Sequence, residues 1–287
     1  FYGRYLAHGS MQILTGKPDE MVTFATSGWQ EAGFDWNRIP GVTSIHLPFD
    51  RLRARVLNVD TFSGMEEMLY SDEAFAGGLS QAHLNGNFGM VLHEHDKYNG
   101  SHRARKSFHF FDGTIVCLGT DIRSTASAEV NTTVNQCLTA QDKPVLVRSG
   151  KTVTPQKASV AGYRSPQWVL HNDVAYLFPD GGQISVSKQT QSGTWYDINH
   201  TAPKDSVHQD VFTLNFDHGM QPSGATYAYI VVPGKHTADE VEEYRKHCPV
   251  SIVSNTPEMQ VVRNKELKLW GMVFYTAGTF KHKAVSY

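Results

Sequence analysis

Residues 85–119 read NGNFGMVLHEHDKYNGSHRARKSFHFFDGTIVCLG, and this stretch decides the fold. Apolar residues alternate in two segments, Phe88–Leu92 and Phe108–Phe111, and a third segment, Thr114–Leu118, is almost wholly apolar. Apolar residues at every second position are typical of strands that bury one face. The pair Asp112-Gly113 between the last two segments is a strong signal for a tight hairpin turn. The stretch therefore predicts consecutive antiparallel strands.

A polar segment follows the first of these strands and precedes the second. Glu94 stands between His93 and His95 where the first strand ends, and the basic letters HRARK occupy residues 102–106. A carboxylate between two imidazoles, next to arginines and a lysine, suits chemistry on an anionic substrate. A solvated loop explains the same residues equally well. The two histidines are a weak metal signal, because they lie on an extended segment and no third ligand is fixed by the sequence.

Strand-like segments separated by turn residues recur at intervals of about ten residues through the rest of the chain. We expect them at residues 129–136, 143–147, 167–178, 184–186, 193–199, 211–219, 227–234, 251 onward, 258–262 and 271–275. This spacing favours an all-β sandwich of antiparallel strands. Residues 237–247 instead predict a helix, with Thr237 as its N-cap, acidic residues in its first turn and basic residues in its last. Residues 250–256 are a candidate junction.

The composition is that of a folded, soluble protein. The chain has 287 residues, of which 40% are hydrophobic and 19% charged, so it can bury one large core or two smaller ones. Its net charge of −2 predicts no general attraction to nucleic acid or to a membrane surface, and any anion site must be a local patch. No apolar run reaches the roughly 18 residues of a membrane span. The three cysteines fit no zinc motif, and Cys117 is expected to be a buried thiol.

The two ends of the chain favour a piece of a longer protein. The chain begins Phe1-Tyr2-Gly3-Arg4, without Met or a targeting segment, and it ends at Tyr287 while a strand pattern continues. We interpret it as an internal segment. Two common kinds of enzyme site are missing from the pattern, since no glycine-rich loop opens a helix after a strand and no Gly-x-Ser-x-Gly motif occurs.

Several motifs together resemble polysaccharide lyase family 8, and they follow the family's order over nearly the whole chain. They are Trp36-x-Arg38-x-Pro40-Gly41-x-Thr43, Lys106–Asp112 followed by Ile115–Gly119, Val130–Val134, Gly193–Asn199, and Asp217-His218-Gly219 followed by Tyr227-Ala228-Tyr229. The segments Leu92–His95 and Ser101–Ala104 are most similar to the chondroitin sulfate ABC lyase branch of the family.

The resemblance implies a mainly β fold. A large antiparallel β super-sandwich would follow the tail of an α/α toroid and precede the start of a small C-terminal β domain. The corresponding boundaries are residues 1–34 for the end of the toroid, 35–250 for the super-sandwich and 251–287 for the C-terminal domain. Trp36 and Trp195 lie in these motifs beside turn residues, and we expect both to be structural, because large aromatic side chains most often serve the core.

The resemblance also implies an activity, the cleavage of chondroitin or dermatan sulfate by β-elimination at the uronic acid. Two alternatives stay open: a hyaluronate or xanthan lyase of the same family, and a non-catalytic β-sandwich that binds glycans. The catalytic Asn, His and Tyr of the family lie on the toroid and are not matched in this chain. The chain alone is therefore expected to be inactive.

Two further catalytic residues follow from the matching motifs. The segment Gly3–His8 resembles the family segment that carries the catalytic arginine, which assigns that role to Arg4. Glu94 is the best match for the glutamate that the β domain contributes, and Glu129 is a weaker rival. In this scheme Arg4 favours the ionised form of the catalytic tyrosine, and Glu94 holds Arg4 in place by a charge-assisted hydrogen bond.

The candidates for substrate binding are His8, Arg103 and Arg105. His8 replaces a second arginine that binds substrate in relatives, and the two arginines are candidates for contacts with sulfate groups. The resemblance implies no required cofactor and leaves a calcium or magnesium ion open. The expected partners are a sulfated glycosaminoglycan and the rest of the same enzyme. The whole would be a secreted or periplasmic monomer that binds neither nucleic acid nor a membrane.

Overall fold

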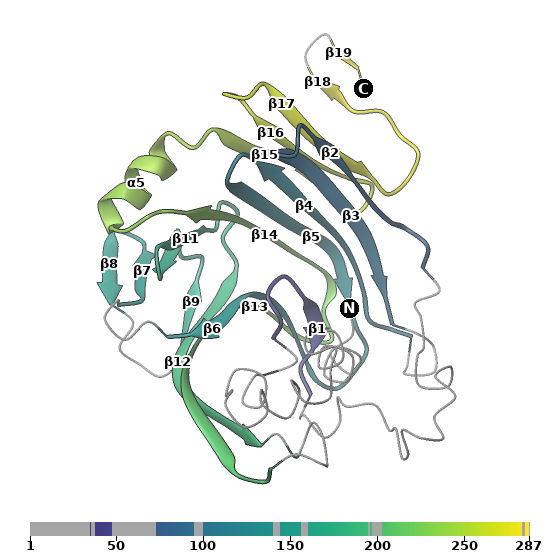
Figure 1. Ribbon diagram of the computed structural model, residues 1–287. Coiled ribbons are helices and arrows are strands. Elements are labelled where there is room, and N and C mark those ends of the chain that lie inside the picture. Colours follow the sequence, from purple (N-terminus) through teal and green to yellow (C-terminus); the bar gives the residue numbers. More distant parts are fainter. Residues whose placement is uncertain are drawn as a thin grey trace.

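The computed structural model describes residues 35, 38–47, 73–94, 100–139, 144–155, 160–194, 196, 203–282 and 285–286. The expectations for Arg4, His8, Trp36 and Trp195, and for the toroid segment at residues 1–34, lie outside this set. Within it the chain is folded mainly into antiparallel β-sheets, as the sequence predicts (Figure 1).

A nine-stranded sheet forms the middle layer of the fold. Its strands, in spatial order, are β2 (Ala76–Gln81), β3 (Asn85–His93), β4 (Arg103–Phe111), β5 (Thr114–Arg123), β14 (Ser223–Pro233), β11 (Val174–Leu177), β10 (Trp168–His171), β7 (Leu146–Ser149) and β8 (Thr152–Pro155). The predicted hairpin turn joins β4 to β5. Asp112 and Gly113 both have positive φ angles, 38° and 85°, as a type I′ turn requires.

Smaller sheets complete the described part of the chain. A five-stranded sheet has the order β1 (Thr43–Ile45), β6 (Glu129–Leu138), β13 (Ser206–Met220), β12 (Gln183–Thr194) and β9 (Val160–Arg164). A three-stranded sheet consists of β15 (Val250–Asn255), β16 (Met259–Asn264) and β17 (Leu269–Phe274), and the short strands β18 (Lys281–His282) and β19 (Val285–Ser286) pair with each other.

The nine-stranded sheet buries residues on both of its faces. On one face, residues such as Leu92 and Ala104 join a core with Val134 and Leu214 of the five-stranded sheet. On the other face, residues such as Leu118 join a second core with residues of the three-stranded sheet and of helix α5. Burial on both faces explains why Thr114–Leu118 reads as a continuous apolar run instead of an alternating one.

Helix α5 (Ala238–Lys246) lies where the sequence predicts a helix. The Thr237 hydroxyl accepts a hydrogen bond from the backbone N–H of Glu240 at 3.2 Å, which satisfies one of the free donors at the helix start. Val241, on the inner face of the helix, is fully buried and belongs to the second core. Glu242 fixes the helix to the nine-stranded sheet, because its Oε1 accepts a hydrogen bond from Nε1 of Trp168 at 2.7 Å.

The three-stranded sheet packs directly on the nine-stranded sheet, and a glycine makes this close approach feasible. A Cβ atom on Gly271 of β17 would lie 2.3 Å from Nδ1 of the buried His109 of β4. A hydrogen bond of 2.9 Å from the Asn87 side chain to the carbonyl oxygen of Met272 joins β3 to β17. Tyr275, the residue after β17, lies near Val91 of β3 and Arg105 of β4, since all three line one pocket.

One expectation from the sequence needs correction. The alternative of a solvated loop for residues 102–106 is wrong, since from Arg103 onward these residues belong to β4. Residues 250–255 form β15, which begins close to residue 251, where the sequence predicts that strands resume. The expected burial of Cys117 is confirmed, and burial raises the pKa of its thiol to about 12. No helix in the described part of the chain has the length and apolar character needed to cross a bilayer.

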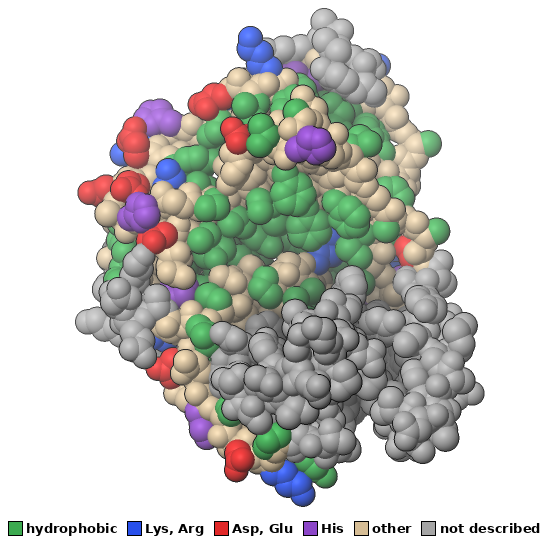
Figure 2. All heavy atoms as spheres, viewed as in Figure 1, with side chains coloured by type: hydrophobic (Ala, Val, Ile, Leu, Met, Phe, Trp, Pro, Cys, Tyr) green, Lys and Arg blue, Asp and Glu red, His purple; other side chains and the backbone are tan. Residues whose placement is uncertain are grey.

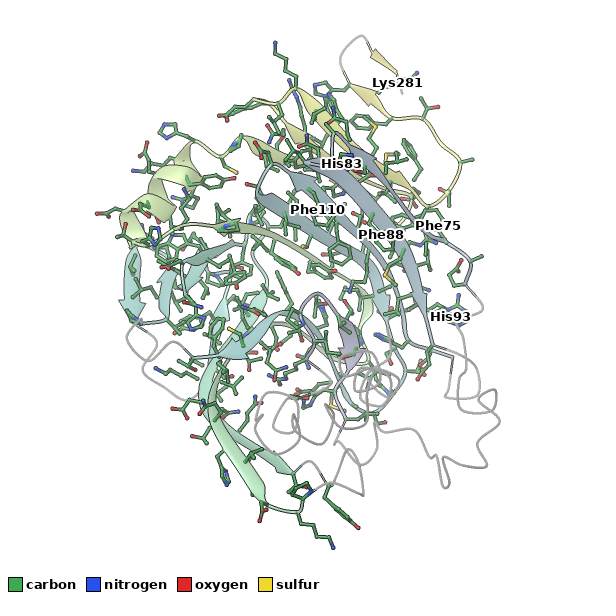
Figure 3. All side chains as sticks on the ribbon, in the orientation of Figure 1. Phe75, His83, Phe88, His93, Phe110 and Lys281 are labelled. Carbon is green, nitrogen blue, oxygen red and sulfur yellow. The ribbon has the colours of Figure 1, made fainter. Side chains whose placement is uncertain are left out.

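Apolar side chains gather on the face of the nine-stranded sheet that is turned toward the viewer in Figure 2. Phe88 of β3 and Phe110 of β4 are 37% and 40% exposed there, and Figure 3 labels both. They share the face on which Leu92 and Ala104 meet the five-stranded sheet, since they follow the same alternation along their strands.

Candidate functional site

Glu94 follows the last residue of β3 and continues the pairing of that strand with β4. Its backbone N–H donates to the carbonyl oxygen of His102 at 2.8 Å, and its Oε2 accepts a longer hydrogen bond, 3.4 Å, from the backbone N–H of His102. Only 6% of Glu94 is exposed. A buried carboxylate is unfavourable unless donors or cations surround it, so this position suits a carboxylate with a defined partner. Figure 3 shows the preceding residue, His93, at the end of β3.

The register of the ladder fixes the side of the sheet on which Glu94 lies. Leu92 pairs with Ala104, and both belong to the core beneath the five-stranded sheet. Side chains two residues apart share a face, so Glu94 and the opposite residue His102 lie on that same side. The Nε2 atom of His102 donates to the carbonyl oxygen of Thr43 at 3.2 Å. Burial lowers the pKa of His102 to about 4, so the imidazole beside Glu94 is neutral at pH 7.

A chain of polar contacts continues from Thr43 into the space between the two sheets. The Thr43 hydroxyl lies 2.8 Å from that of Thr132, which in turn lies 2.8 Å from Nε2 of His218. Nearby, Nζ of Lys106 donates a hydrogen bond to the carbonyl oxygen of Gly41. Residues from separate sequence motifs thus meet in one buried polar cluster. The cluster connects β1 and the turn before it to the nine-stranded sheet, close to Glu94.

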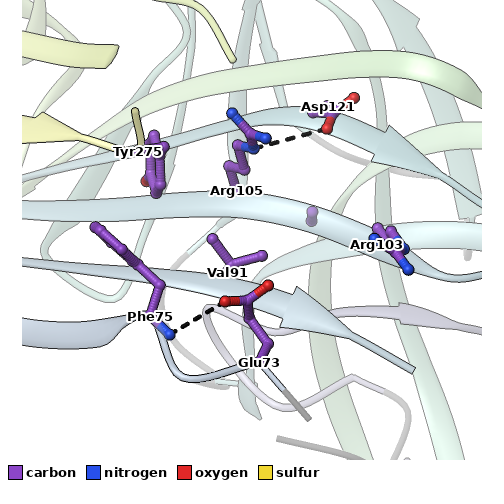
Figure 4. A pocket seen from close by; sticks show the side chains of 8 residues that line it. Glu73, Phe75, Val91, Arg103, Arg105, Asp121 and Tyr275 are labelled. Carbon is purple, nitrogen blue, oxygen red and sulfur yellow. Dashed lines mark hydrogen bonds and ion pairs between the residues drawn. The ribbon is translucent and has the colours of Figure 1, made fainter. Parts of the chain in front are cut away.

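Arg103 and Arg105 lie on the other side of the nine-stranded sheet. They alternate along β4 with Ala104, which faces the five-stranded sheet, and so they point away from the side of Glu94. There they line a pocket of about 190 Å³ beside the end of β17 (Figure 4). The remaining lining residues are Glu73, Phe75, Val91, Ala104, Asp121 and Tyr275. We call this the arginine pocket.

Arg105 is held on several sides within the arginine pocket. Its Nε lies 3.7 Å from Oδ2 of Asp121, and its Nη1 donates to the carbonyl oxygen of Pro257. Its guanidinium carbon lies 5.7 Å from the ring centroid of Tyr275, within the range of a cation–π contact. The rings of Phe75 and Tyr275 are 5.1 Å apart between centroids and form an aromatic wall. Figure 4 shows Arg105 between Tyr275 and Asp121.

Arg103 is exposed and lies at the other end of the arginine pocket (Figure 4). Its Nη2 lies 3.0 Å from Nε2 of His93, and that nitrogen is also 3.2 Å from the carbonyl oxygen of Gly100. A single imidazole nitrogen either accepts from the guanidinium or donates to the carbonyl, according to the tautomer. His93 therefore connects the loop before β4 to the mouth of the pocket.

The structure thus separates the predicted site residues onto two faces of one sheet. It brings Arg103 and Arg105 together, and it does not bring Glu94 to them. Glu129, the rival of Glu94, is exposed at the start of β6, whereas Glu94 is buried. The pairing of Arg4 with Glu94 stays a prediction, because Arg4 lies outside the described residues. Among those residues no group of three or more His, Cys, Asp or Glu side chains is arranged to hold a metal ion.

Sequence reasoning missed Phe75, Asp121 and Tyr275 as partners of the two arginines. Asp121 enters the pocket at a β-bulge: Arg103 pairs with Arg123 and Arg105 pairs with Thr120, which leaves an extra residue on β5. The φ angle of Asp121 is 54°, an uncommon value for a residue other than glycine. The available signal in the sequence was Asp121, the single carboxylate in a strand that is mostly apolar.

Comparison with known proteins places the chain in a family. The model of polysaccharide lyase family 8, super-sandwich domain, matches residues 1–245, and that of the family's C-terminal β-sandwich domain matches residues 251–286. A chondroitin sulfate ABC exolyase of Bacteroides thetaiotaomicron is 53% identical over 234 residues, covering 81% of this chain and 22% of that protein. A chondroitinase-AC of Pedobacter heparinus is 34% identical over 280 residues, covering 96% of this chain and 36% of that protein.

A solved structure of a chondroitinase AC lyase, studied with oligosaccharide complexes, has the same fold as this chain. It superimposes with a TM-score of 0.74 at 32% identity, covering 89% of this chain and 35% of that chain. The chain therefore spans between 22% and 36% of the length of these three proteins. By the two family models, by the exolyase identity and by the shared fold, the chain belongs to polysaccharide lyase family 8.

Proposed function

We propose that this chain is part of a glycosaminoglycan lyase that cleaves chondroitin or dermatan sulfate by β-elimination at the uronic acid and releases unsaturated oligosaccharides. The observation that carries the proposal is the identity to the chondroitin sulfate ABC exolyase over most of the chain. The domain boundaries we infer are residues 1–34 for the end of an α/α toroid, 35–250 for the super-sandwich and 251–287 for the C-terminal domain.

The proposed reaction removes the C5 proton of the uronate and breaks the bond between C4 and the glycosidic oxygen. The C5 proton is weakly acidic while the neighbouring carboxylate is charged, so the site must stabilise the negative charge that develops in the transition state. A tyrosine of the toroid would take this proton and protonate the leaving oxygen. We assign to Arg4 the role of favouring the tyrosinate, because an opposite charge nearby stabilises the ionised form.

Glu94 is proposed to orient Arg4 from the β side. Its position supports this role: it is nearly buried, and its backbone and carboxylate are both bonded to His102. A guanidinium would give this carboxylate a strong, directional, charge-assisted hydrogen bond. A site formed between two domains is also a common place for a ligand.

We infer that His8, Arg103 and Arg105 bind substrate and that the elimination requires no cofactor. If a divalent cation takes part, we expect calcium or magnesium. The proposed partners are the sulfated glycosaminoglycan and the remainder of the same enzyme, in a monomer. Because a highly charged polymer does not cross membranes, we propose that the enzyme is secreted or periplasmic.

The test is the ultraviolet absorbance of the unsaturated uronate released by the full-length protein from separate solutions of chondroitin sulfate, dermatan sulfate, hyaluronate and xanthan. We expect release from the first two. Release from hyaluronate or xanthan alone would replace the proposal with the other lyase activity. Binding of chondroitin sulfate without any release would favour a non-catalytic glycan-binding protein.

A further inference from the structure

We propose that the arginine pocket is a second saccharide site, which binds one anionic sugar residue of a sulfated glycosaminoglycan on the face of the nine-stranded sheet away from Glu94. The choice of polymer rests on the proposed function. The site itself rests on the pocket's shape, its charges and the bulge that forms part of its lining.

The size and the lining of the pocket fit a single sugar residue. Its volume of about 190 Å³ is that of roughly six water molecules and below the range of roughly 300 Å³ and more for drug-sized ligands. One wall is aromatic, formed by Phe75 and Tyr275, and both rings are only half-buried. The apolar face of a pyranose ring can pack on such a wall while its polar edge turns toward charged groups.

The charged groups of the pocket favour an anion. Three guanidinium groups, those of Arg103, Arg105 and Arg123, lie in or beside it against the carboxylates of Glu73 and Asp121. One guanidinium group can donate two parallel hydrogen bonds to two oxygens of a sulfate or carboxylate. An ammonium group lacks this planar geometry. Arg103 is exposed at the mouth and is well placed for a sulfate or a uronate carboxylate.

The geometry of Arg105 is fixed before any ligand arrives. The β-bulge in β5 turns Asp121 toward Nε of Arg105, and the carbonyl oxygen of Pro257 accepts a hydrogen bond from Nη1. β-Bulges often occur where they change the direction of a side chain. A positive φ angle in a residue other than glycine raises the energy of the backbone, and it persists only where the surrounding structure holds it. A preordered guanidinium loses less entropy when it binds a ligand, which raises affinity.

A second saccharide site would act on polymers differently from short substrates. Glu94 lies on one face of the sheet and the arginine pocket on the other, so one tetrasaccharide held at the first cannot also fill the second. A long chain can occupy both, and its attachment at one site raises its effective concentration at the other. The arginine pocket would therefore serve as a hold on the polymer.

The experiment measures binding of a chondroitin sulfate tetrasaccharide to the 287-residue chain by isothermal titration calorimetry, with saturation-transfer NMR to identify the sugar protons near aromatic rings. The variants are Arg103→Gln and Phe75→Ala. Matched controls are Arg164→Gln, an exposed arginine on β9, and Phe110→Ala, an exposed phenylalanine on the opposite face of β4. Circular dichroism confirms that each variant is folded, and Tyr275→Phe is a second, milder change to the aromatic wall.

We expect Arg103→Gln to weaken binding by about tenfold, because the variant loses a charge-assisted hydrogen bond to the anion and a tenfold change in Kd corresponds to about 1.4 kcal/mol. Phe75→Ala should weaken binding and reduce the transfer signal from the sugar ring, of which the Tyr275 ring retains a part, and both controls should bind like wild type. Unchanged affinity in both pocket variants would overturn the proposal. So would inorganic sulfate binding as tightly as the tetrasaccharide with no effect of Phe75→Ala, because the site would then take a free anion only. Uronate release by the full-length protein is measured separately, so failure of the pocket and failure of the lyase activity are distinguishable.

Discussion

Lys106 Nζ donates a hydrogen bond to the carbonyl oxygen of Gly41, which joins β4 of the nine-stranded sheet to the turn before β1. Lys106 is only 3% exposed, and burial lowers its pKa from 10.5 to about 7. The titratable groups around it are Cys117, His102 and His218, and the two histidines are themselves held neutral by burial, with pKa values of about 4. The lysine is thus a buried cation that the fold tolerates near neutral pH.

This burial predicts a specific dependence of stability on pH. Between about pH 7 and 10.5 the unfolded chain binds the proton of Lys106 and the folded chain does not. The free energy of unfolding should therefore rise with pH across this window, by about 1.4 kcal/mol for each unit of the pKa difference that is traversed. Below pH 7 both states are protonated, and the full unfavourable effect of the buried charge is present.

The comparison that isolates this effect is with Lys106→Met, measured by urea unfolding from pH 6 to pH 9. The variant also loses the hydrogen bond to Gly41, which lowers its stability equally at every pH. We expect the stability of wild type relative to the variant to increase with pH. Parallel curves for the two proteins would show that Lys106 is not titrating in this window.

Gly271→Ala should destabilise the contact between the three-stranded sheet and the nine-stranded sheet. The new Cβ would lie 2.3 Å from Nδ1 of His109, a ring that is fully buried and cannot move aside freely. Overpacking of this kind costs about 1–3 kcal/mol. Gly77→Ala is the control, because a Cβ there meets no atom within 4 Å. Thermal unfolding should show a lower Tm for the first variant only; equal Tm values would contradict the close packing at β17.

Phe75→Ala in the full-length protein should affect long and short substrates differently. If the arginine pocket holds the polymer, the KM for long chondroitin sulfate should rise by about tenfold, since attachment at a second site raises the effective concentration. The KM for a tetrasaccharide should change much less. Initial rates of uronate release across a series of chain lengths give this ratio, with Phe110→Ala as the control. A rise in KM that is the same at every length would count against the polymer-holding role.

The predictable parts of the fold depend on residues close together in the sequence. Alternation in Phe88–Leu92, the turn at Asp112-Gly113 and the cap at Thr237 are local patterns, and the structure contains the strands, the type I′ turn and the capped helix that they indicate. The mainly β architecture follows from the same signals. The expected order of the domains came from the resemblance to the family motifs. Secondary-structure propensities alone do not predict it.

The parts that could not be predicted depend on distant residues. Lys106 looks like a surface lysine in the sequence, and its burial follows from Gly41, 65 residues away. Arg105 is fixed by Pro257, 152 residues away. The opposite orientations of Glu94 and Arg103 follow from the register between β3 and β4. A shift of one residue in that register would have placed the two on the same face, and the sequence between the strands does not determine it.

Arg4 and Glu94 are expected to act as one unit. Arg4→Ala should lower the turnover of the full-length protein at least as much as Glu94→Gln, and the double variant should be little worse than the worse single one. Residues that depend on each other show such non-additive losses, whereas independent residues show additive ones. The measurement is kcat for all three variants on chondroitin sulfate. Fully additive losses would refute the pairing and leave Glu94 with some other role.

The most direct test of the proposed catalytic role is the rate of uronate release from chondroitin sulfate by the full-length Glu94→Gln protein. Glutamine keeps the shape of the side chain and removes the charge that would orient Arg4. We predict that kcat falls by about a hundredfold or more, as when one preorganised electrostatic group is lost, while KM changes only a few-fold. A variant that releases unsaturated uronate at the wild-type rate would contradict the assignment of Glu94 to the active site.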